Sequence, residues 1–240
     1  MKTIRVLVAD DHAIVRAGLR ALLDAAGDMD VIGEAENGQE AVREAERLRP
    51  DVVLLDLAMP LLNGVEAARQ IAHELPATKV LILSAYSDAQ HLQKAVEAGA
   101  TGYLMKETAS KDLLRAIREA CKGNGFFSPP IARRLLKQWR NRDLESKSTA
   151  ALELTSRQTQ VVQLIAEGYS SKQIAGLLSV SIKTVGKHRQ ALMDKLDIHE
   201  IASLTRYAVS SGVVESKPTS NWPVTRNGTP ADESDRLKHP

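Results

Sequence analysis

The sequence predicts an α/β domain followed by a small all-helical domain, with a polar linker between them. Three observations lead to this prediction. Short apolar runs alternate with helical patterns over the first 122 residues, a polar and basic stretch follows, and the strand signal disappears from Leu154 onward. The chain of 240 residues is long enough for two domains of ordinary size. Aromatic residues make up only 3% of it, so the cores must consist mainly of Leu, Ile, Val and Ala.

Five apolar runs in the first domain, residues 1–122, are predicted to be buried strands. They are Ile4–Ala9, Val31–Ala35, Val52–Leu57, Val80–Ser84 and Gly102–Met105. Because helical patterns separate them, we expect a five-stranded, doubly wound parallel sheet with both faces covered. The expected strand order is the flavodoxin-like 2-1-3-4-5, in which ligands bind at the carboxyl ends of the strands.

The first and last helices of this domain show the clearest helical periodicity. The predicted buried face of the first helix consists of Ile14, Ala17, Gly18, Ala21, Leu22 and Ala25. That of the last helix consists of Leu113, Ala116, Ile117, Ala120 and Cys121. Gly123-Asn124-Gly125 is expected to end the last helix.

Residues 123–150 are predicted to be a linker that contains a short basic helix, about Ile131–Arg140. Residues 151–214 are predicted to form the second domain. Residues 215–240 contain four of the nine prolines and little apolar surface, so we expect this tail to be disordered. Net charge is −4 over residues 1–123, +4 over 129–150 and +2 over 151–214. This asymmetry suggests a metal- or phosphate-handling module ahead of a polyanion-binding module.

Composition also limits the location and class of the protein. No apolar run approaches the roughly 18 residues that a membrane-spanning helix needs, and Asp10 and Asp11 come too early for a signal peptide. The only cysteine, Cys121, cannot form an intrachain disulfide, which suits a reducing compartment. We therefore expect a cytoplasmic protein without a membrane partner.

The second domain is predicted to contain four helices. They run from Thr155 or Ser156 to Glu167, from Ser170 or Ser171 to Leu178, from Ser181 to about Leu196, and from about Glu200 to Ser211. Ser179-Val180 makes a tight turn between the second and third helices. Two helices joined in this way form a helix-turn-helix, whose second helix enters the major groove of DNA.

Polar residues follow four of the five predicted strands. Asp10 and Asp11 follow the first, Asp56 lies near the end of the third, Ser84 ends the fourth and Lys106 follows the fifth. Two carboxylates about 4 Å apart repel by roughly 4 kcal/mol at an effective dielectric constant of 20, so this cluster favours a bound cation. Mg²⁺ suits carboxylate ligands, and a metal-neutralised site leaves one carboxylate free to act as a nucleophile. A single acid, such as Asp11, could instead merely cap a helix; the joint pattern favours a site.

The segments Val8–His12, Leu55–Pro60, Asn63-Gly64 and Gly102–Lys106 resemble the receiver domain of two-component response regulators. This resemblance implies that Asp56 accepts a phosphoryl group from a sensor histidine kinase. It implies that Asp11 and Asp56, with the Ala58 backbone carbonyl, ligate Mg²⁺ while Asp10 helps to orient the ion.

The same resemblance gives Ser84 and Lys106 the task of contacting the phosphoryl oxygens. Tyr103 would be the aromatic residue that turns inward on activation, although an ordinary half-buried strand residue is an open alternative. Glu107 departs from the proline that many receivers carry after the lysine, a position outside the phosphoryl chemistry.

The third helix of the second domain carries four cations against one acid. The cations are Lys183, Lys187, Arg189 and Lys195, and Ile182, Val185, Leu192, Met193 and Leu196 are expected to leave a polar face for DNA. A solvated basic hairpin is the alternative. However, the segments Leu154–Arg157, Val161-Val162, Ala166–Gly168, Ile174-Ala175, Thr184-Val185 and His188-Arg189 resemble the LuxR-type helix-turn-helix of the NarL/FixJ subfamily.

That second resemblance implies that Lys183, Thr184, Lys187, His188 and Arg189 lie along double-stranded promoter DNA. The alternative for His188 is a packed or capped histidine. The resemblance also implies that the last helix, around Ile201, Leu204 and Val209, pairs two domains in a homodimer that phosphorylation favours; for Ile201 and Leu204 the alternative is domain core. RNA polymerase is a further candidate partner. Three residues depart from the subfamily pattern: Gln158, Gln173 and Gly186.

The sequence therefore predicts a DNA-binding response regulator whose only catalysis is self-phosphorylation and slow loss of the phosphoryl group. A phosphatase of the haloacid dehalogenase type is one rival, but it places two aspartates two residues apart after the first strand, unlike Asp10-Asp11 and the distant Asp56. Another rival is a pseudo-receiver that only dimerises and binds DNA constitutively, and the intact set of Asp11, Asp56, Ser84 and Lys106 disfavours it. Whether the receiver masks the DNA-binding helix stays open.

Overall fold

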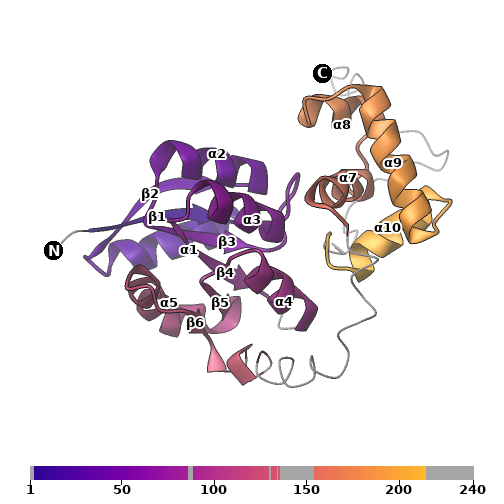
Figure 1. Cartoon of the computed structure of the whole chain (residues 1–240). Coiled ribbons are helices and arrows are strands. Elements are labelled where there is room, and N and C mark those ends of the chain that lie inside the picture. The colour runs from indigo at the N-terminus through magenta and orange to yellow at the C-terminus, as the bar shows by residue number, and fades with distance from the viewer. Residues whose placement is uncertain (1–2, 86–88, 130, 134, 136–153, 215–240) are drawn as a thin grey trace, which may run out of the picture.

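The computed structural model describes residues 3–85, 89–129, 131–133, 135 and 154–214, which form an α/β domain and a helical domain (Figure 1). Within these ranges, the helices are too short or too polar to cross a bilayer. The predicted tail at 215–240 lies outside the described residues, as does most of the predicted basic helix. Of that helix, residues 131–133 and 135 are described and are helical.

The first domain is a parallel sheet flanked by helices. Its elements are β1 (Ile4–Ala9), α1 (Ala13–Asp24), β2 (Met29–Ala35), α2 (Gly38–Leu48), β3 (Val52–Asp56), α3 (Gly64–Glu74), β4 (Lys79–Ser84), α4 (Ala89–Glu97), β5 (Gly102–Met105), α5 (Lys106–Cys121) and β6 (Phe126–Phe127). The strand order β2-β1-β3-β4-β5-β6 confirms the predicted order and adds a sixth strand. The sixth strand, β6, lies inside the predicted linker and pairs with Gly102 and Tyr103 of β5. Its two residues are too few to show an alternating pattern in the sequence.

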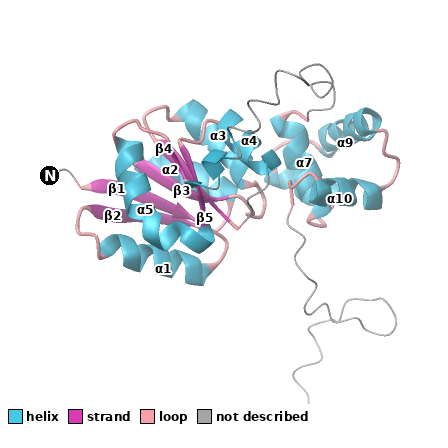
Figure 2. Ribbon diagram, turned by 90° about the horizontal axis from the view of Figure 1, so that it is seen from below, coloured by secondary structure: helices cyan, strands magenta, loops and turns pink. Residues whose placement is uncertain are grey.

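Helices cover both faces of the sheet, so the domain has two hydrophobic clusters (Figure 2). Helices α2, α3 and α4 pack on one face, while α1 and α5 pack on the other. Strand β3 is buried throughout, with Val53 and Leu55 in one cluster and Val52 and Leu54 in the other. A strand that is apolar on both faces is expected at the centre of such a sheet.

The buried face of α1 differs from the prediction. Ile14 is 83% exposed, and Ala17, Gly18, Ala21 and Ala25 also face solvent. The helix instead buries Arg16 and Leu23, and it packs Leu19, Leu22 and Ala26 against the sheet. Apolar residues occupy most of this helix, so its spacing is compatible with two stripes. The ion pairs of Arg16 with Glu34 and Glu36 select the other one.

The predicted face of α5 is confirmed with one exception. Leu113, Ala116, Ile117 and Ala120 are fully buried, whereas Cys121 is exposed. Cys121 is the last residue of the helix, where the chain turns away from the sheet.

The second domain contains four helices: α7 (Ser156–Ala166), α8 (Ser171–Leu177), α9 (Ile182–Leu196) and α10 (Ile201–Ser210). Thr155 and Ser170 cap α7 and α8, and Gln158 and Gln173 complete reciprocal capping boxes. These two glutamines, which depart from the subfamily pattern, therefore have a structural role. One small cluster, which includes Leu164, Val185, Leu192 and Leu204, holds the four helices together.

Candidate functional site

The strand register brings the predicted polar residues to one edge of the sheet. Ala9 of β1 is aligned with Leu55 of β3, so Asp10 and Asp56 follow at the same level. Asp56 is aligned with Leu83, and Ser84 with Met105, the residue before Lys106. Four separate segments of the chain thus deliver their side chains to the carboxyl edge.

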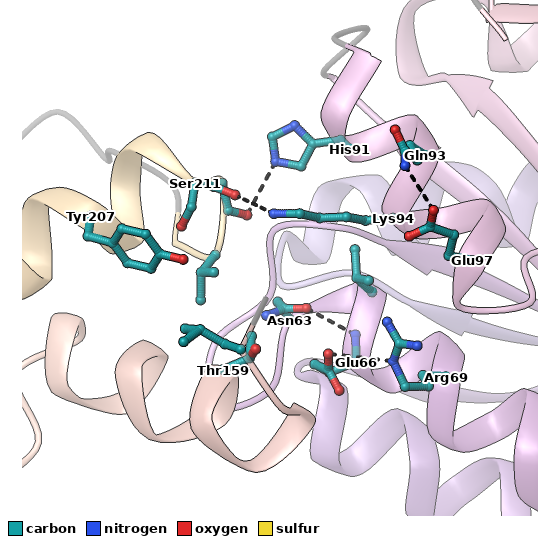
Figure 3. A pocket seen from close by; sticks show the side chains of 14 residues that line it. Asn63, Glu66, Arg69, His91, Gln93, Lys94, Glu97, Thr159, Tyr207 and Ser211 are labelled. Carbon is teal, nitrogen blue, oxygen red and sulfur yellow. Dashed lines mark hydrogen bonds and ion pairs between the residues drawn. The ribbon is translucent and has the colours of Figure 1, made fainter. Parts of the chain in front are cut away.

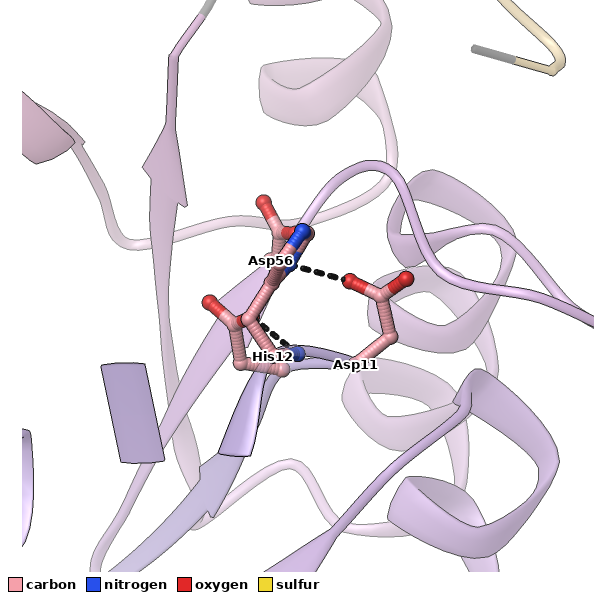
Figure 4. A group of neighbouring side chains, drawn as sticks. Asp11, His12 and Asp56 are labelled. Carbon is pink, nitrogen blue, oxygen red and sulfur yellow. Dashed lines mark hydrogen bonds and ion pairs between the residues drawn. The ribbon is translucent and has the colours of Figure 1, made fainter. Parts of the chain in front are cut away.

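Asp10, Asp11, His12 and Asp56 form a compact cluster at this edge. Each offers a ligand atom, and these atoms lie within 4.8 Å of one another. Figure 4 shows Asp11, His12 and Asp56 converging at the ends of the strands. Asp10 and Asp56 are almost fully buried, and His12 Nδ1 lies 2.7 Å from Asp11 Oδ1. His12 was not predicted as part of the site, although its position directly after the two aspartates could have indicated it.

Lys106 supplies the positive charge of the cluster. Its Nζ lies 2.8 Å from Asp10 Oδ2 and 3.0 Å from Asp56 Oδ2. Burial lowers the pKa of Lys106, but the attraction of Asp56 and Asp10 outweighs this effect and raises it. The lysine therefore stays charged and bridges two carboxylates that would otherwise repel each other.

Burial is also the main influence on the pKa of Asp56. It raises the pKa of this carboxyl to about 6; Lys106 opposes the rise, while Asp10 and Asp11 add to it. Since one lysine faces three carboxylates, the charged form of Asp56 is incompletely compensated.

The donor set of the cluster fits Mg²⁺. Carboxylate oxygens from Asp11 and Asp56 are ligands that Mg²⁺ prefers, and a divalent cation would balance the excess negative charge. Ala58 is half-buried in the loop that follows β3, two residues after Asp56. The imidazole of His12 is a less suitable donor for this ion; its side chain is 54% exposed and it is bonded to the acids.

Arg16 of α1 contacts the backbone of Asp10, a role that was not predicted. This side chain is buried, and its Nη1 donates to the Asp10 backbone carbonyl at 2.8 Å. Its Nη2 and Nε bond Glu36 at 2.6 Å and Glu34 at 3.2 Å. Arg16 therefore ties the end of β1 to the end of β2. The incorrect assignment of the buried face of α1 concealed this role.

Ser84 and Tyr103 lie on the predicted fourth and fifth strands, and both side chains are buried. Ser84 is fully buried at the end of β4, adjacent to the edge that carries Asp56. Tyr103 is also fully buried, within the cluster beneath α2, α3 and α4. Tyr103 is thus fully buried and not half-buried, and its role as a switch residue stays a prediction.

The predicted DNA-contacting residues lie on different sides of α9. Lys183 and Lys187 are exposed and one turn apart, opposite the buried Val185 and Leu192. Thr184, His188 and Arg189 are half-buried. Ile182, which was expected on the apolar side, is 55% exposed at the start of the helix.

Within the described residues, hydrogen bonds join the two domains at two places. At one of them, His91 and Lys94 of α4 bind the carbonyl groups of Gly212 and Ser211, at 3.2 and 2.9 Å. A cavity of about 460 Å³ lies beside this contact, and its lining includes Glu66, Arg69, Lys94, Thr159 and Tyr207 (Figure 3). The residues of the acidic cluster do not line this cavity, so the two sites are separate. In this arrangement, Lys183 and Lys187 remain exposed, and the receiver does not cover them.

Family models match both domains. Residues 6–118 match the response regulator receiver domain, and residues 152–208 match the bacterial regulatory proteins of the luxR family. The response regulator protein VraR of Staphylococcus aureus is 35% identical over 213 residues, which are 89% of this chain and all of VraR.

Solved structures agree with this assignment. A structure of the RcsB response regulator of Salmonella typhimurium is 26% identical and covers 88% of this chain and 99% of that chain, with a TM-score of 0.60. A complex of RcsB with DNA is 27% identical with the same coverage and a TM-score of 0.54. The chain therefore belongs to the two-component response regulators that join a receiver domain to a LuxR-type DNA-binding domain.

Proposed function

We propose that this chain is a transcription regulator in which Asp56 accepts a phosphoryl group and thereby changes dimerisation and promoter binding. The carboxylate of Asp56, buried 3.0 Å from the ammonium group of Lys106 and beside two further acids, is the observation that carries the proposal. A buried carboxylate next to a fixed cation is suited to hold a negatively charged group at one oxygen.

The side chains at the edge divide the reaction between them. An oxygen of Asp56 attacks the phosphorus of a phosphohistidine, the bond from phosphorus to the imidazole nitrogen breaks, and an acyl phosphate forms. Asp11, Asp56 and the Ala58 carbonyl would hold Mg²⁺, which neutralises charge on the transferring group. Lys106 moves from its bridging contact to a phosphoryl oxygen, and the Ser84 hydroxyl donates to another. Asp10 retains the lysine near the site through its 2.8 Å contact.

The new contacts can supply the free energy of a switch. Shifting a two-state equilibrium from 1:99 to 99:1 requires about 5.5 kcal/mol. A hydrogen bond to a charged group contributes about 1.5–3 kcal/mol, so one from Ser84 and one from Lys106 approach this value. Ser84 ends β4 and Lys106 begins α5, and α4, which bonds the second domain through Lys94, lies between them in the chain.

The second domain is proposed to bind promoter DNA through α9. Lys183 and Lys187 present an exposed pair of cations, and the short turn before α9 is that of a helix-turn-helix. Ile201 and Val209 of α10 are 46% and 39% exposed, so an apolar surface is available for pairing two domains. Leu204, by contrast, is fully buried in the core of its own domain. Solved structures of RcsB include dimers bound to DNA, in accord with this proposal.

The decisive test is phosphoryl uptake from acetyl phosphate with Mg²⁺, or from a sensor histidine kinase, measured by intact mass. We expect the wild type to gain one phosphoryl group and the Asp56→Asn variant to gain none. Asp30→Asn, which changes an exposed acid on β2, is the matched control and should behave like the wild type. Phosphoryl uptake by Asp56→Asn would contradict the assignment of the acceptor.

A second measurement tests the switch. Affinity for promoter DNA, measured by electrophoretic mobility shift with and without the phosphoryl donor, should rise on phosphorylation of the wild type. It should not change for Asp56→Asn. Equal affinity of phosphorylated and unphosphorylated wild type would favour the rival reading, in which the chain binds DNA constitutively.

A further inference from the structure

The second contact between the domains involves the loop that follows the phosphoryl acceptor. This loop, residues 57–63, joins β3 to α3 and is called the acceptor loop below. Gln163 of α7, which is 1% exposed, reaches it from the DNA-binding domain. Its Oε1 accepts from the Asn63 backbone N–H at 2.8 Å, and its Nε2 donates to the Met59 carbonyl at 3.0 Å. The amide therefore bonds both ends of the turn at once.

The middle of the acceptor loop is held from the same helix. Leu61 has a φ of 66°, a left-handed conformation that is uncommon for a residue with a Cβ and that persists where its surroundings fix it. Its backbone N–H donates to Glu167 Oε2 at 3.2 Å, and its side chain packs against the core cluster of the DNA-binding domain. Gln163 Nε2 also donates to Glu167 Oε1 at 2.8 Å, so the two side chains act together.

The acceptor loop is in turn attached closely to Asp56. The Gly64 N–H donates to the Leu57 carbonyl at 2.8 Å, and the Leu57 N–H donates to Asp56 Oδ1 at 2.9 Å. A Cβ on Gly64 would lie 2.0 Å from the Asp56 carbonyl oxygen, so the end of the loop rests directly on the backbone of the acceptor. A displacement of the loop would therefore reach both Asp56 and the neighbouring Ala58.

We propose that Gln163 is a positioning residue for the phosphoryl-acceptor site, contributed by the DNA-binding domain. It fixes the Met59 carbonyl and the Asn63 N–H, and so holds the peptide of Ala58 in the orientation that metal binding needs. This inference rests on the proposed role of Asp56 and adds a residue that acts on it from the other domain. Docking of α7 and formation of the acceptor site then favour each other, because free energies of coupling are reciprocal.

The chemistry of Gln163 explains why a glutamine is required. The side chain has to accept at one atom and donate at the other, and an amide does both. A glutamate could accept from Asn63 but could not donate to Met59 when ionised, and it would place a carboxylate beside Glu167. Gln163→Glu should consequently be more damaging than Gln163→Ala, although it is nearly isosteric.

The test measures Mg²⁺ binding and phosphorylation in the full chain. Mg²⁺ affinity of the unphosphorylated protein is determined by titration calorimetry, and phosphorylation by acetyl phosphate is followed over a range of Mg²⁺ concentrations. For Gln163→Ala we expect about a three- to tenfold weaker affinity, the effect of losing one buried hydrogen bond, with a smaller change in the rate at saturating Mg²⁺. Gln163→Glu should exceed this loss.

Gln160→Ala is the matched control. Gln160 lies one turn earlier on the same helix and bonds Arg157 within its own domain at 3.1 Å. Its replacement should leave both measurements at the wild-type value. Amide hydrogen exchange of Leu61 and Asn63 in the metal-free chain gives a readout that is independent of activity. It should become faster in Gln163→Ala and stay unchanged in Gln160→Ala.

The possible outcomes separate the two proposals. If the wild type binds Mg²⁺ and takes up a phosphoryl group, but Gln163→Ala matches it in affinity and loop exchange, the positioning role is wrong while the proposed function stands. Tighter Mg²⁺ binding or faster phosphorylation in Gln163→Ala would also overturn the positioning role, because the contact would then be inhibitory. A wild type without phosphoryl uptake would overturn both.

Discussion

The acidic cluster and helix α9 use charge in opposite ways. In the cluster, charged side chains from three strand ends are brought together where Asp10 and Asp56 are almost fully buried, and one lysine faces three acids. On α9, Lys183 and Lys187 project from a single helix into solvent, opposite its apolar side. The first arrangement depends on the tertiary fold, whereas the second depends on the spacing of residues within one element.

This contrast indicates how the two regions respond to a ligand. The buried charges lack hydration, so protons and metal ions change their energy strongly, as the raised pKa of Asp56 indicates. The exposed cations of α9 keep their hydration and interact with a polyanion through screened electrostatics. A buried site is therefore suited to switching and an exposed one to binding.

The largest expected effect tests the cost of the buried charge. Asp56→Asn should raise the free energy of unfolding by about 1–3 kcal/mol at pH 7.5 without metal, because the folded chain raises the pKa of Asp56 from 3.8 to about 6. A raised folded pKa means that the cost is absent below about pH 4 and complete above about pH 6. In urea denaturation, the gain in the free energy of unfolding of Asp56→Asn over the wild type should therefore grow between about pH 4 and pH 6.

The amide retains the contact with the Leu57 N–H, so the variant removes charge rather than packing. Asp24→Asn, at an exposed acid on α1, is the control and should show no such growth with pH. If the free energy of unfolding changed with pH in the same way for both variants, the charge of Asp56 would cost no more than that of an exposed acid.

A smaller effect should follow from Mg²⁺. At ten times its dissociation constant, an ion that binds only the folded chain stabilises it by about 1.4 kcal/mol. We expect this shift in the wild type and its loss in Asp11→Asn and after chelation with EDTA, as measured by thermal unfolding. An equal shift in Asp11→Asn would show that the ion acts elsewhere.

The next prediction concerns the exposed side of the comparison. Lys187→Ala should weaken DNA binding about fivefold, near 1 kcal/mol, and reduce the slope of log affinity against log salt by about 1. Arg206→Ala, which removes an exposed cation from α10, is the control for the change in net charge. Fluorescence anisotropy at several salt concentrations distinguishes them. Identical slopes for the two variants would place Lys187 away from the DNA.

The smallest effect is expected at Gly186. This glycine lies within α9 and a Cβ there would meet no atom within 4 Å, so Gly186→Ala should stabilise the domain by about 0.5–1 kcal/mol. Gly176→Ala on α8 meets equally open space and should give a similar gain. If Gly186→Ala alone also weakens DNA binding, the glycine allows the backbone to approach the groove closely.

Much of the fold could be predicted because the periodic signals were strong. The five longer strands, their order and the four helices of the second domain follow from apolar runs and capping residues. The prediction for α1 was wrong for an informative reason. A helix with apolar residues around most of its surface carries two candidate stripes. The position of Glu34 on β2 and of Glu36 directly after it decides between them.

The candidate site was predicted only in part. Asp10, Asp11, Asp56, Ser84 and Lys106 could be found because each follows or ends a strand, and parallel strands gather their carboxyl ends at one edge. Arg16 gave no such signal, and His12 could have been indicated only by its position directly after Asp10 and Asp11. The contacts of Gln163 with Met59 and Asn63 join residues about 100 positions apart, and no local pattern indicates them.

The elements, their alternation and the charge carried by α9 could be predicted from the sequence, because these features depend on spacing along a short stretch of chain. The packed fold was needed to show which face of α1 is buried, how strongly Asp56 is desolvated, and that α7 bonds the acceptor loop. Burial and long-range hydrogen bonds depend on the surroundings of a residue. Those surroundings exist only after distant segments have packed together.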